Sequence, residues 1–180
     1  MKTQDLQNGD LLFVSSQSDM AEAIQRSTGR YNHVAIFFDG WMYHKNGNRN
    51  DYATWFNEAI EAGNKIEVFL QDDECYDVYV FPDIDVKAVW KRAEQHLYKP
   101  YNNSFYPNTT GFYCSEYIAE ILPIFGTIAM QFGDEDEEVA PFWQQYYKEL
   151  GLAVPLHQPG TNPSQLAQSE KLVYKGRLDD

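Results

Sequence analysis

The stretch "HVAIFFDGWMYHK", residues 33–45, constrains the fold of this chain most. Its apolar run VAIFF is far too short to cross a bilayer. β-Branched and aromatic residues of this kind favour an extended strand. Asp39 and Gly40 form the strongest short-range signal for a two-residue hairpin turn. The stretch therefore predicts two antiparallel strands in which Phe38 lies opposite Trp41.

This register would bring two histidines together. If Phe38 pairs with Trp41, then Ala35 faces His44, and His33 and His44 lie on the same face of the sheet. Their Cβ atoms would be about 7–8 Å apart or less. Two histidines in this relation can serve as a general base and the group that orients it. The plainer interpretation is two ordinary strand histidines.

The rest of the chain reads as a mixture of helices and strands without an internal repeat. A chain of 180 residues with 43% apolar residues can bury one core, so we expect one domain over residues 1–180. The expected fold class is α+β, with a central antiparallel sheet and the helix of Cys114 packed against it. Periodicity and capping signals predict helices within 18–29, 52–63, 83–100, 114–122 and 141–151, and strands within 8–16, 65–70, 76–82 and 171–176.

The formal net charge of −13 limits the partners of the protein. Acidic charge repels phosphate backbones, so we expect neither nucleic acid nor a bare anionic membrane as a partner. A substrate with a free amine would be favoured, although the simpler effect of the charge is to keep the protein in solution. No signal peptide is visible at the N-terminus. The protein is therefore expected in the cytoplasm, or exported with its signal peptide removed, and the oligomeric state is left open.

One of the two cysteines, Cys114, stands where a polar loop gives way to a predicted helix. The unpaired N–H groups at a helix N-terminus favour a thiolate, and they can bind an oxyanion formed on an attacked carbonyl. This position therefore suits nucleophilic acyl transfer. We expect no disulfide with Cys75, because a disulfide would remove the nucleophile. The alternative is a buried cysteine acting as a small apolar residue.

Several motifs resemble one family. The segment "KPYNNSFYPNTTGFYCSEYI" is similar to the nucleophile segment of NlpC-type papain-like cysteine hydrolases, and "GDLLF" resembles them too. The strand "HVAIFF" precedes Cys114, and "CSE" stands in place of "CSG". This order resembles the circularly permuted branch, which comprises the YiiX-like and lecithin:retinol acyltransferase-like proteins. The tail "PGTNPSQLAQS" is similar to the YiiX-type group. The resemblance runs from Gly9 to about Ser169 and implies a permuted papain-like fold.

The resemblance also implies residue roles. Cys114 matches the nucleophile and His33 matches the base, while His44 falls where the third member of a catalytic triad belongs. Tyr101 matches the tyrosine that lines the oxyanion site. Glu116 matches the acid of the "CSE" motif, although a carboxylate in the first helical turn also caps the helix.

The function implied is cysteine-dependent hydrolysis of an amide, of a peptide or cell-wall stem-peptide type, through a thioester. Tyr113 joins Tyr101 and Glu116 as an expected oxyanion or substrate-binding residue. One alternative is an acyltransferase or lipid-ester hydrolase with "FWQQYY" lining an acyl channel, and another is a non-catalytic binding module. No cofactor is expected. The candidate ligands His33, His44, Cys114 and Glu116 fit no standard zinc spacing, so we expect no metal site.

Overall fold

The computed structural model describes residues 1–39, 54–57, 64–96 and 99–179. None of the helices in these ranges has the length and apolar character needed to cross a membrane. In chain order the elements are η1 (Thr3–Asp5), β1 (Leu11–Ser15), α1 (Asp19–Thr28), β2 (His33–Asp39), β3 (Thr54–Asn57), β4 (Asn64–Lys65), α2 (Ile66–Phe69), β5 (Cys75–Val80), α3 (Val86–Gln95), α4 (Cys114–Ile121), β6 (Ile128–Ala129), α5 (Pro141–Leu150), β7 (Pro159–Gly160), α6 (Pro163–Ala167) and β8 (Val173–Arg177).

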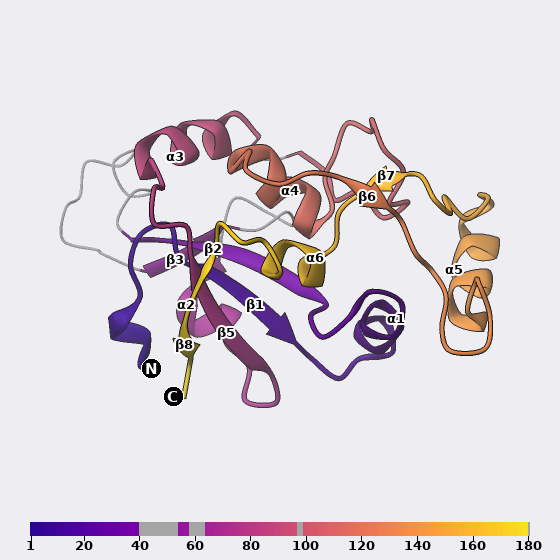
Figure 1. The fold of residues 1–180 in the computed structure, drawn as a ribbon, viewed down its shortest axis with the longest axis horizontal. Helices are drawn as coiled ribbons and strands as arrows, with labels where there is room; N and C mark the ends of the chain where they lie inside the picture. Colours follow the sequence, from indigo (N-terminus) through magenta and orange to yellow (C-terminus); the bar gives the residue numbers. More distant parts are fainter. Residues whose placement is uncertain (40–53, 58–63, 97–98, 180) are drawn as a thin grey trace.

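A six-stranded sheet forms the centre of the fold, in the order β4-β3-β2-β1-β5-β8 (Figure 1). Each neighbouring pair is antiparallel. The first strand, β1, lies between β2 and β5, and the last strand, β8, occupies one edge. The predicted α+β class with a central antiparallel sheet is confirmed.

The two faces of the sheet carry separate apolar clusters. Alternate residues of β1 and β2 point to opposite sides, so Phe13 and Val34 share one face while Leu12 and Ala35 share the other. Helices α3, α4 and α6 cover the first face, here called the α4 face, and α2 covers the second, here called the α2 face (Figure 1).

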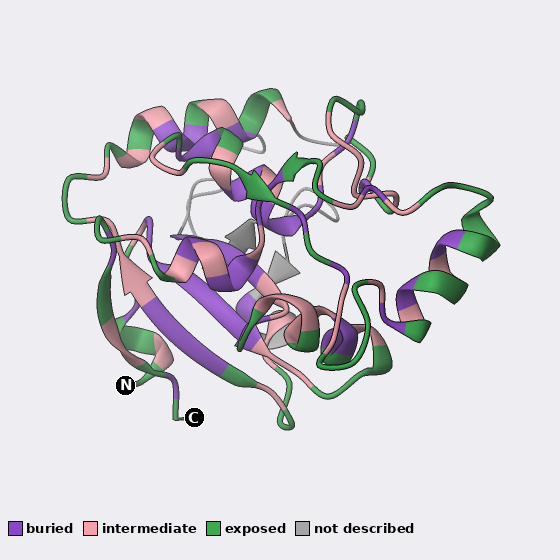
Figure 2. Cartoon of the chain, turned by 45° about the vertical axis from the view of Figure 1, so that its right-hand side comes forward, coloured by how far each residue is buried: buried purple, intermediate pink, exposed green. Residues whose placement is uncertain are grey.

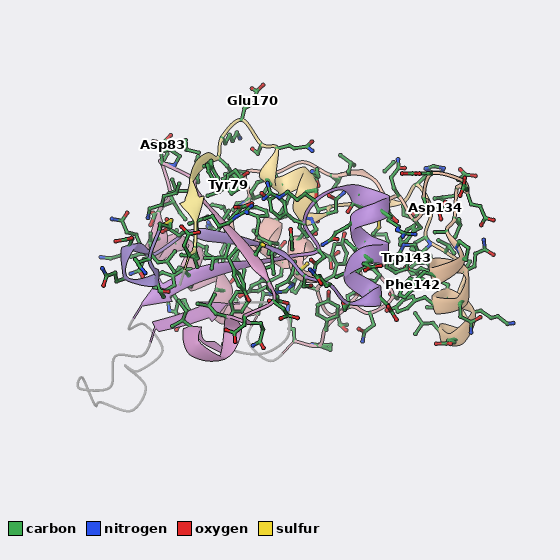
Figure 3. The ribbon with its side chains drawn as sticks, turned by 90° about the horizontal axis from the view of Figure 1, so that it is seen from below. Tyr79, Asp83, Asp134, Phe142, Trp143 and Glu170 are labelled. Atoms are coloured by element: carbon green, nitrogen blue, oxygen red, sulfur yellow. The ribbon has the colours of Figure 1, made fainter. Side chains whose placement is uncertain are left out.

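A third cluster lies at one end of the sheet, around α1 and α5. The indole N–H of Trp143 donates to Ser27 Oγ at 3.1 Å and so joins the two helices. Figure 3 shows Trp143 and Phe142 between these helices. Trp143 and Tyr147 are buried on the inner side of α5, and Figure 2 shows buried and exposed residues alternating along this helix. The helix therefore packs by a single aromatic face.

Several elements differ from the sequence prediction. Within the predicted helix 52–63, residues Thr54–Asn57 form strand β3. The predicted strand 65–70 is instead a short strand followed by α2. Short apolar runs fit either type of element, and pairing with β2 decides in favour of a strand here. Helix α6 was not predicted, although Asn162 caps it and Pro163 opens it.

The predicted hairpin register is wrong. Phe38 pairs with Trp55 and Asp39 pairs with Thr54, whereas Trp41 lies outside the described residues. The Asp-Gly signal favours a turn locally, but β3 takes the place beside β2 that the hairpin required. The placement of His44 opposite Ala35 therefore loses its basis, and His44 itself lies outside the described residues.

A buried carboxylate joins β5 to β8 and to the end of α1. Asp77 is 2% exposed, and its oxygens accept bonds from Arg177 Nε at 2.9 Å and from Tyr31 Oη at 2.8 Å. A third contact, with Arg30 Nη2, is 2.7 Å long. A buried charge needs such partners, because an unpaired one is costly. This network therefore holds the edge strand β8 on the sheet.

We predict that Asp77→Ala lowers the free energy of unfolding by about 2 kcal/mol, because charged hydrogen bonds of this kind are lost together. Urea denaturation of both variants measures the effect, with Asp83→Ala as the control, since Asp83 is exposed. Equal stability of the two variants would contradict a structural role for Asp77.

Candidate active site

Cys114 is the first residue of α4, and packing fixes its position. Ile118 and Ile121, on the same helix, are fully buried against the α4 face of the sheet. Cys114 itself is 5% exposed, and it forms no disulfide with Cys75, which is exposed at the start of β5. The prediction of two free cysteines is confirmed. The sulfur thus sits at a helix N-terminus, where the first N–H groups have no partner within the helix.

Tyr101 is brought to the thiol by a short bridge between two loop segments. Its partner in the bridge is Phe112, whose N–H donates to the Pro100 carbonyl at 3.2 Å. The Tyr101 hydroxyl lies within hydrogen-bonding reach of the backbone N–H and the thiol of Cys114. Burial, followed by the charge of the neighbouring thiolate, raises the pKa of Tyr101 well above its usual value. The hydroxyl therefore keeps its proton and can donate it to a hydrogen bond.

Glu116 links the N-terminal end of α4 to the loop that carries Tyr101. One carboxylate oxygen accepts the Tyr113 N–H at 3.4 Å and the Asn102 side-chain amide at 3.5 Å. Burial raises the pKa of Glu116, and these two hydrogen bonds oppose that effect. Asn102 also donates to the Tyr106 carbonyl at 2.8 Å. The observed contacts of Glu116 are thus with the cap of α4 and the loop that carries Tyr101.

Tyr113 faces the loop before α6. Its hydroxyl accepts the Thr161 N–H at 3.1 Å, and burial raises its pKa. The Thr161 hydroxyl donates in turn to Ser115 Oγ at 2.9 Å. These bonds hold the 159–163 segment against the start of α4.

A cavity opens beside Cys114. Its wall is mostly apolar and aromatic, with hydroxyl and amide groups but no acidic or basic side chain among the described residues. An expected free amine on the substrate therefore finds no carboxylate in this part of the wall. The lining residues are Ile24, Ser27, Thr28, Asn32, Tyr101, Phe105, Tyr113, Cys114, Ser115, Ile128, Met130, Gln131, Phe132, Trp143, Thr161, Asn162 and Pro163.

The strand register places His33 beside residues of the α2 face. His33 is the first residue of β2 and pairs with Val14, which lies on the α2 face. The ring centroid of His33 is 6.2 Å from that of Phe69, which packs on the same face. Cys114 lies on the other side, with Val34. The expected contact between His33 and Cys114 is therefore not supported by the strand register.

Two more histidines, His96 and His157, lie within the described residues. His96 contacts Glu120 at 3.4 Å and packs its ring on Phe112. His157 is exposed and contacts Glu138 at 3.0 Å. Neither lines the cavity.

Sequence reasoning missed Asn32, Ser115 and Thr161. All three line the cavity, and each lies within or directly beside a motif whose roles were assigned to other residues. Asn32 directly precedes "HVAIFF", and Thr161 precedes the cap of α6. Only the side-chain contacts show what these polar residues do.

Gly111 allows the bridge that places Tyr101. A Cβ at this position would lie 2.0 Å from the Pro100 carbonyl oxygen, whereas one at Gly126 would meet nothing within 4 Å. We predict that Gly111→Ala lowers the free energy of unfolding by about 1–3 kcal/mol through overpacking. Gly126→Ala should change it little. Urea titrations of both variants provide the measurement, and equal stabilities would show that the close approach is not required.

Two comparisons with known proteins place the chain. The crystal structure of the metalloprotein YiiX from Escherichia coli O157:H7 superposes with a TM-score of 0.74 at 22% identity, covering 95% of this chain and 97% of that one. This likeness confirms the fold. Among the described residues no three His, Cys, Asp or Glu side chains gather as metal ligands. No curated protein matches the chain.

The family comparison is the more specific one. The model of the permuted papain-like amidases of the YaeF/YiiX type matches residues 5–173. This range includes the sheet, the helix of Cys114 and the loop that carries Tyr101. The chain therefore belongs to the C92 family of permuted papain-like amidases.

Proposed function

We propose that the protein hydrolyses an amide bond with Cys114 as the nucleophile. The observation that carries this proposal is the placement of the thiol at the first turn of α4, beside the Tyr101 hydroxyl and in the wall of a cavity. Membership of an amidase family favours an amide over an ester as the bond that is cleaved.

The chemistry follows from these groups. The Cys114 thiolate attacks the amide carbonyl carbon, a C–S bond forms, and the carbonyl oxygen becomes an oxyanion. The Tyr101 hydroxyl and N–H groups of the first turn of α4 are positioned to donate hydrogen bonds to that oxygen. The intermediate collapses to a thioester as the C–N bond breaks and the nitrogen takes a proton. Water then attacks the thioester, which releases the acid and regenerates the thiol.

A base must accept the thiol proton and deliver it to the leaving nitrogen. We keep His33 in this role and His44 as the residue that orients it, because the order of the sequence motifs matches that of the permuted family. Tyr31 precedes β2 and lies on the α4 face, as Val34 does. Residues three apart on a regular strand lie on opposite faces, so the alternation of β2 does not continue back to Tyr31. A base role for His33 requires its side chain to turn around this strand end.

The cavity supports a substrate with an apolar group beside the scissile bond. Phe105, Phe132 and Trp143 provide an aromatic wall, and Met130 adds a flexible apolar surface. A charged group placed there would lose its hydration without gaining an opposite charge from the described wall. A peptide amide with an apolar residue on the acyl side fits this environment best.

We predict that Cys114→Ala abolishes hydrolysis of fluorogenic peptidyl amides with Leu or Phe on the acyl side. The control is Cys75→Ala, which removes an exposed cysteine and should leave the rate near that of the parent protein. Release of the fluorophore measures both. Residual turnover in Cys114→Ala, or an equal loss in Cys75→Ala, would refute the assignment of the nucleophile.

We also predict that His33→Ala lowers kcat/KM by about 100-fold, because a general base contributes at least this much. The control is His157→Asn, since His157 is exposed and has a φ of 63°, which Asn tolerates. The pH dependence of the rate should change in His33→Ala and stay that of the parent protein in His157→Asn. Unchanged kinetics in that variant would assign the base to another residue.

A further inference from the structure

We propose that the side-chain amide of Asn32 is a second hydrogen-bond donor to the carbonyl oxygen of the substrate. This inference rests on the proposed function, because it needs an acyl group bound at Cys114. Asn32 and Cys114 line the same cavity, although they are far apart in the sequence. No motif assigned a role to Asn32.

The orientation of the Asn32 amide is fixed by its neighbours. Its oxygen accepts the backbone N–H of Ser16 at 2.8 Å and the Gln25 side-chain amide at 3.1 Å. A backbone N–H can only donate, so the amide oxygen must face Ser16. The backbone N–H of Asn32 donates to the Val14 carbonyl at 2.9 Å, which anchors the residue to β1. The group is therefore held rigidly before a substrate arrives.

One donor of Asn32 is left for a ligand. The amide nitrogen carries two hydrogens, and one is used by Ser16 Oγ at 2.9 Å. Among the described residues no hydrogen bond uses the second hydrogen. Since Asn32 is partly exposed and lines the cavity, this hydrogen can be offered to a bound group.

Three hydroxyl groups of the wall already donate hydrogen bonds. Ser27 and Thr28 donate to carbonyls of the preceding turn of α1, at 2.9 Å and 2.7 Å. Thr161 donates to Ser115. Asn32 thus differs from these three hydroxyl groups, because one of its side-chain N–H groups is used by no hydrogen bond among the described residues.

A fixed N–H of this kind stabilises developing negative charge without having to reorient. When the C–S bond forms at Cys114, the carbonyl oxygen gains charge, and the Tyr101 hydroxyl supplies one donor. Loss of a single oxyanion donor lowers rates by about 10²–10³ in known enzymes. Asn32 would act on the substrate oxygen directly, which makes it a catalytic residue in this proposal.

Asn32→Asp separates this role from a structural one. The carboxylate keeps the bonds from Ser16 N and Gln25, and the Ser16 hydroxyl can turn to donate to the second oxygen. Only the N–H offered to the cavity is lost. We expect kcat for peptidyl amide hydrolysis to fall by about 100-fold while the melting temperature stays within a few degrees. Gln25→Leu removes the hydrogen bond from Gln25 to the Asn32 side-chain oxygen and keeps the Asn32 amide, so it should lower kcat far less.

The added charge of Asp needs its own control. Asn162→Asp puts a carboxylate into the same cavity and keeps the side-chain oxygen that caps α6, at 2.8 Å from Gln165 N. Rates of Cys114 alkylation by iodoacetamide, measured across pH for both variants, report the thiol alone. Equal losses of kcat in the two Asp variants, or a parental kcat in Asn32→Asp, would overturn the proposal. Failure of the proposed function would appear separately, as turnover that survives in Cys114→Ala.

Discussion

The packing of α4 on β2 is the interaction on which the site depends. Ile118 and Ile121 are fully buried against Val34 and Ile36, and each such side chain contributes about 1.5–3 kcal/mol when it leaves water. This contact fixes the helix axis and, with it, the point in space at which the helix begins. The reactive sulfur of Cys114 stands at that point. Its position is therefore set by apolar packing several residues away.

Polar contacts then arrange the loops around the fixed helix end. Glu116 ties Tyr113 and Asn102 to the first turn, and the 159–163 segment is held through Ser115. The cavity wall is built from α1, α4, α5, β6, the start of α6 and neighbouring loops, whereas no strand of the six-stranded sheet lines it among the described residues. His33 pairs with Val14 and its ring lies near Phe69, both on the α2 face, whereas Cys114 belongs to the cluster of the α4 face. The start of β2 at His33, with Asn32 before it, lies between the α4 face and the α2 face.

The sequence predicted the parts of the site that depend on local chemistry. The helix start at Cys114 was predicted from the loop-to-helix junction, and Tyr101 was named from the family resemblance; the structure has Cys114 at the first turn of α4 with Tyr101 beside it. The register of β2 could not be predicted in this way, because an Asp-Gly pair favours a turn without excluding a more distant strand as partner. Asn32 was missed for a related reason, since its importance lies in contacts with residues 16 and 25, which no local pattern reveals.

The central claim is that Cys114 carries the acyl group during turnover, and mass spectrometry of the trapped enzyme tests it most directly. The protein is mixed with a peptidyl amide or activated ester bearing an apolar acyl residue, quenched in acid within milliseconds and digested with pepsin. The account predicts an added mass equal to the acyl group minus one hydrogen, on the peptide that contains Cys114, and its loss on treatment with neutral hydroxylamine. Acylation of Cys75 instead, or turnover with no hydroxylamine-sensitive adduct on Cys114, would contradict it.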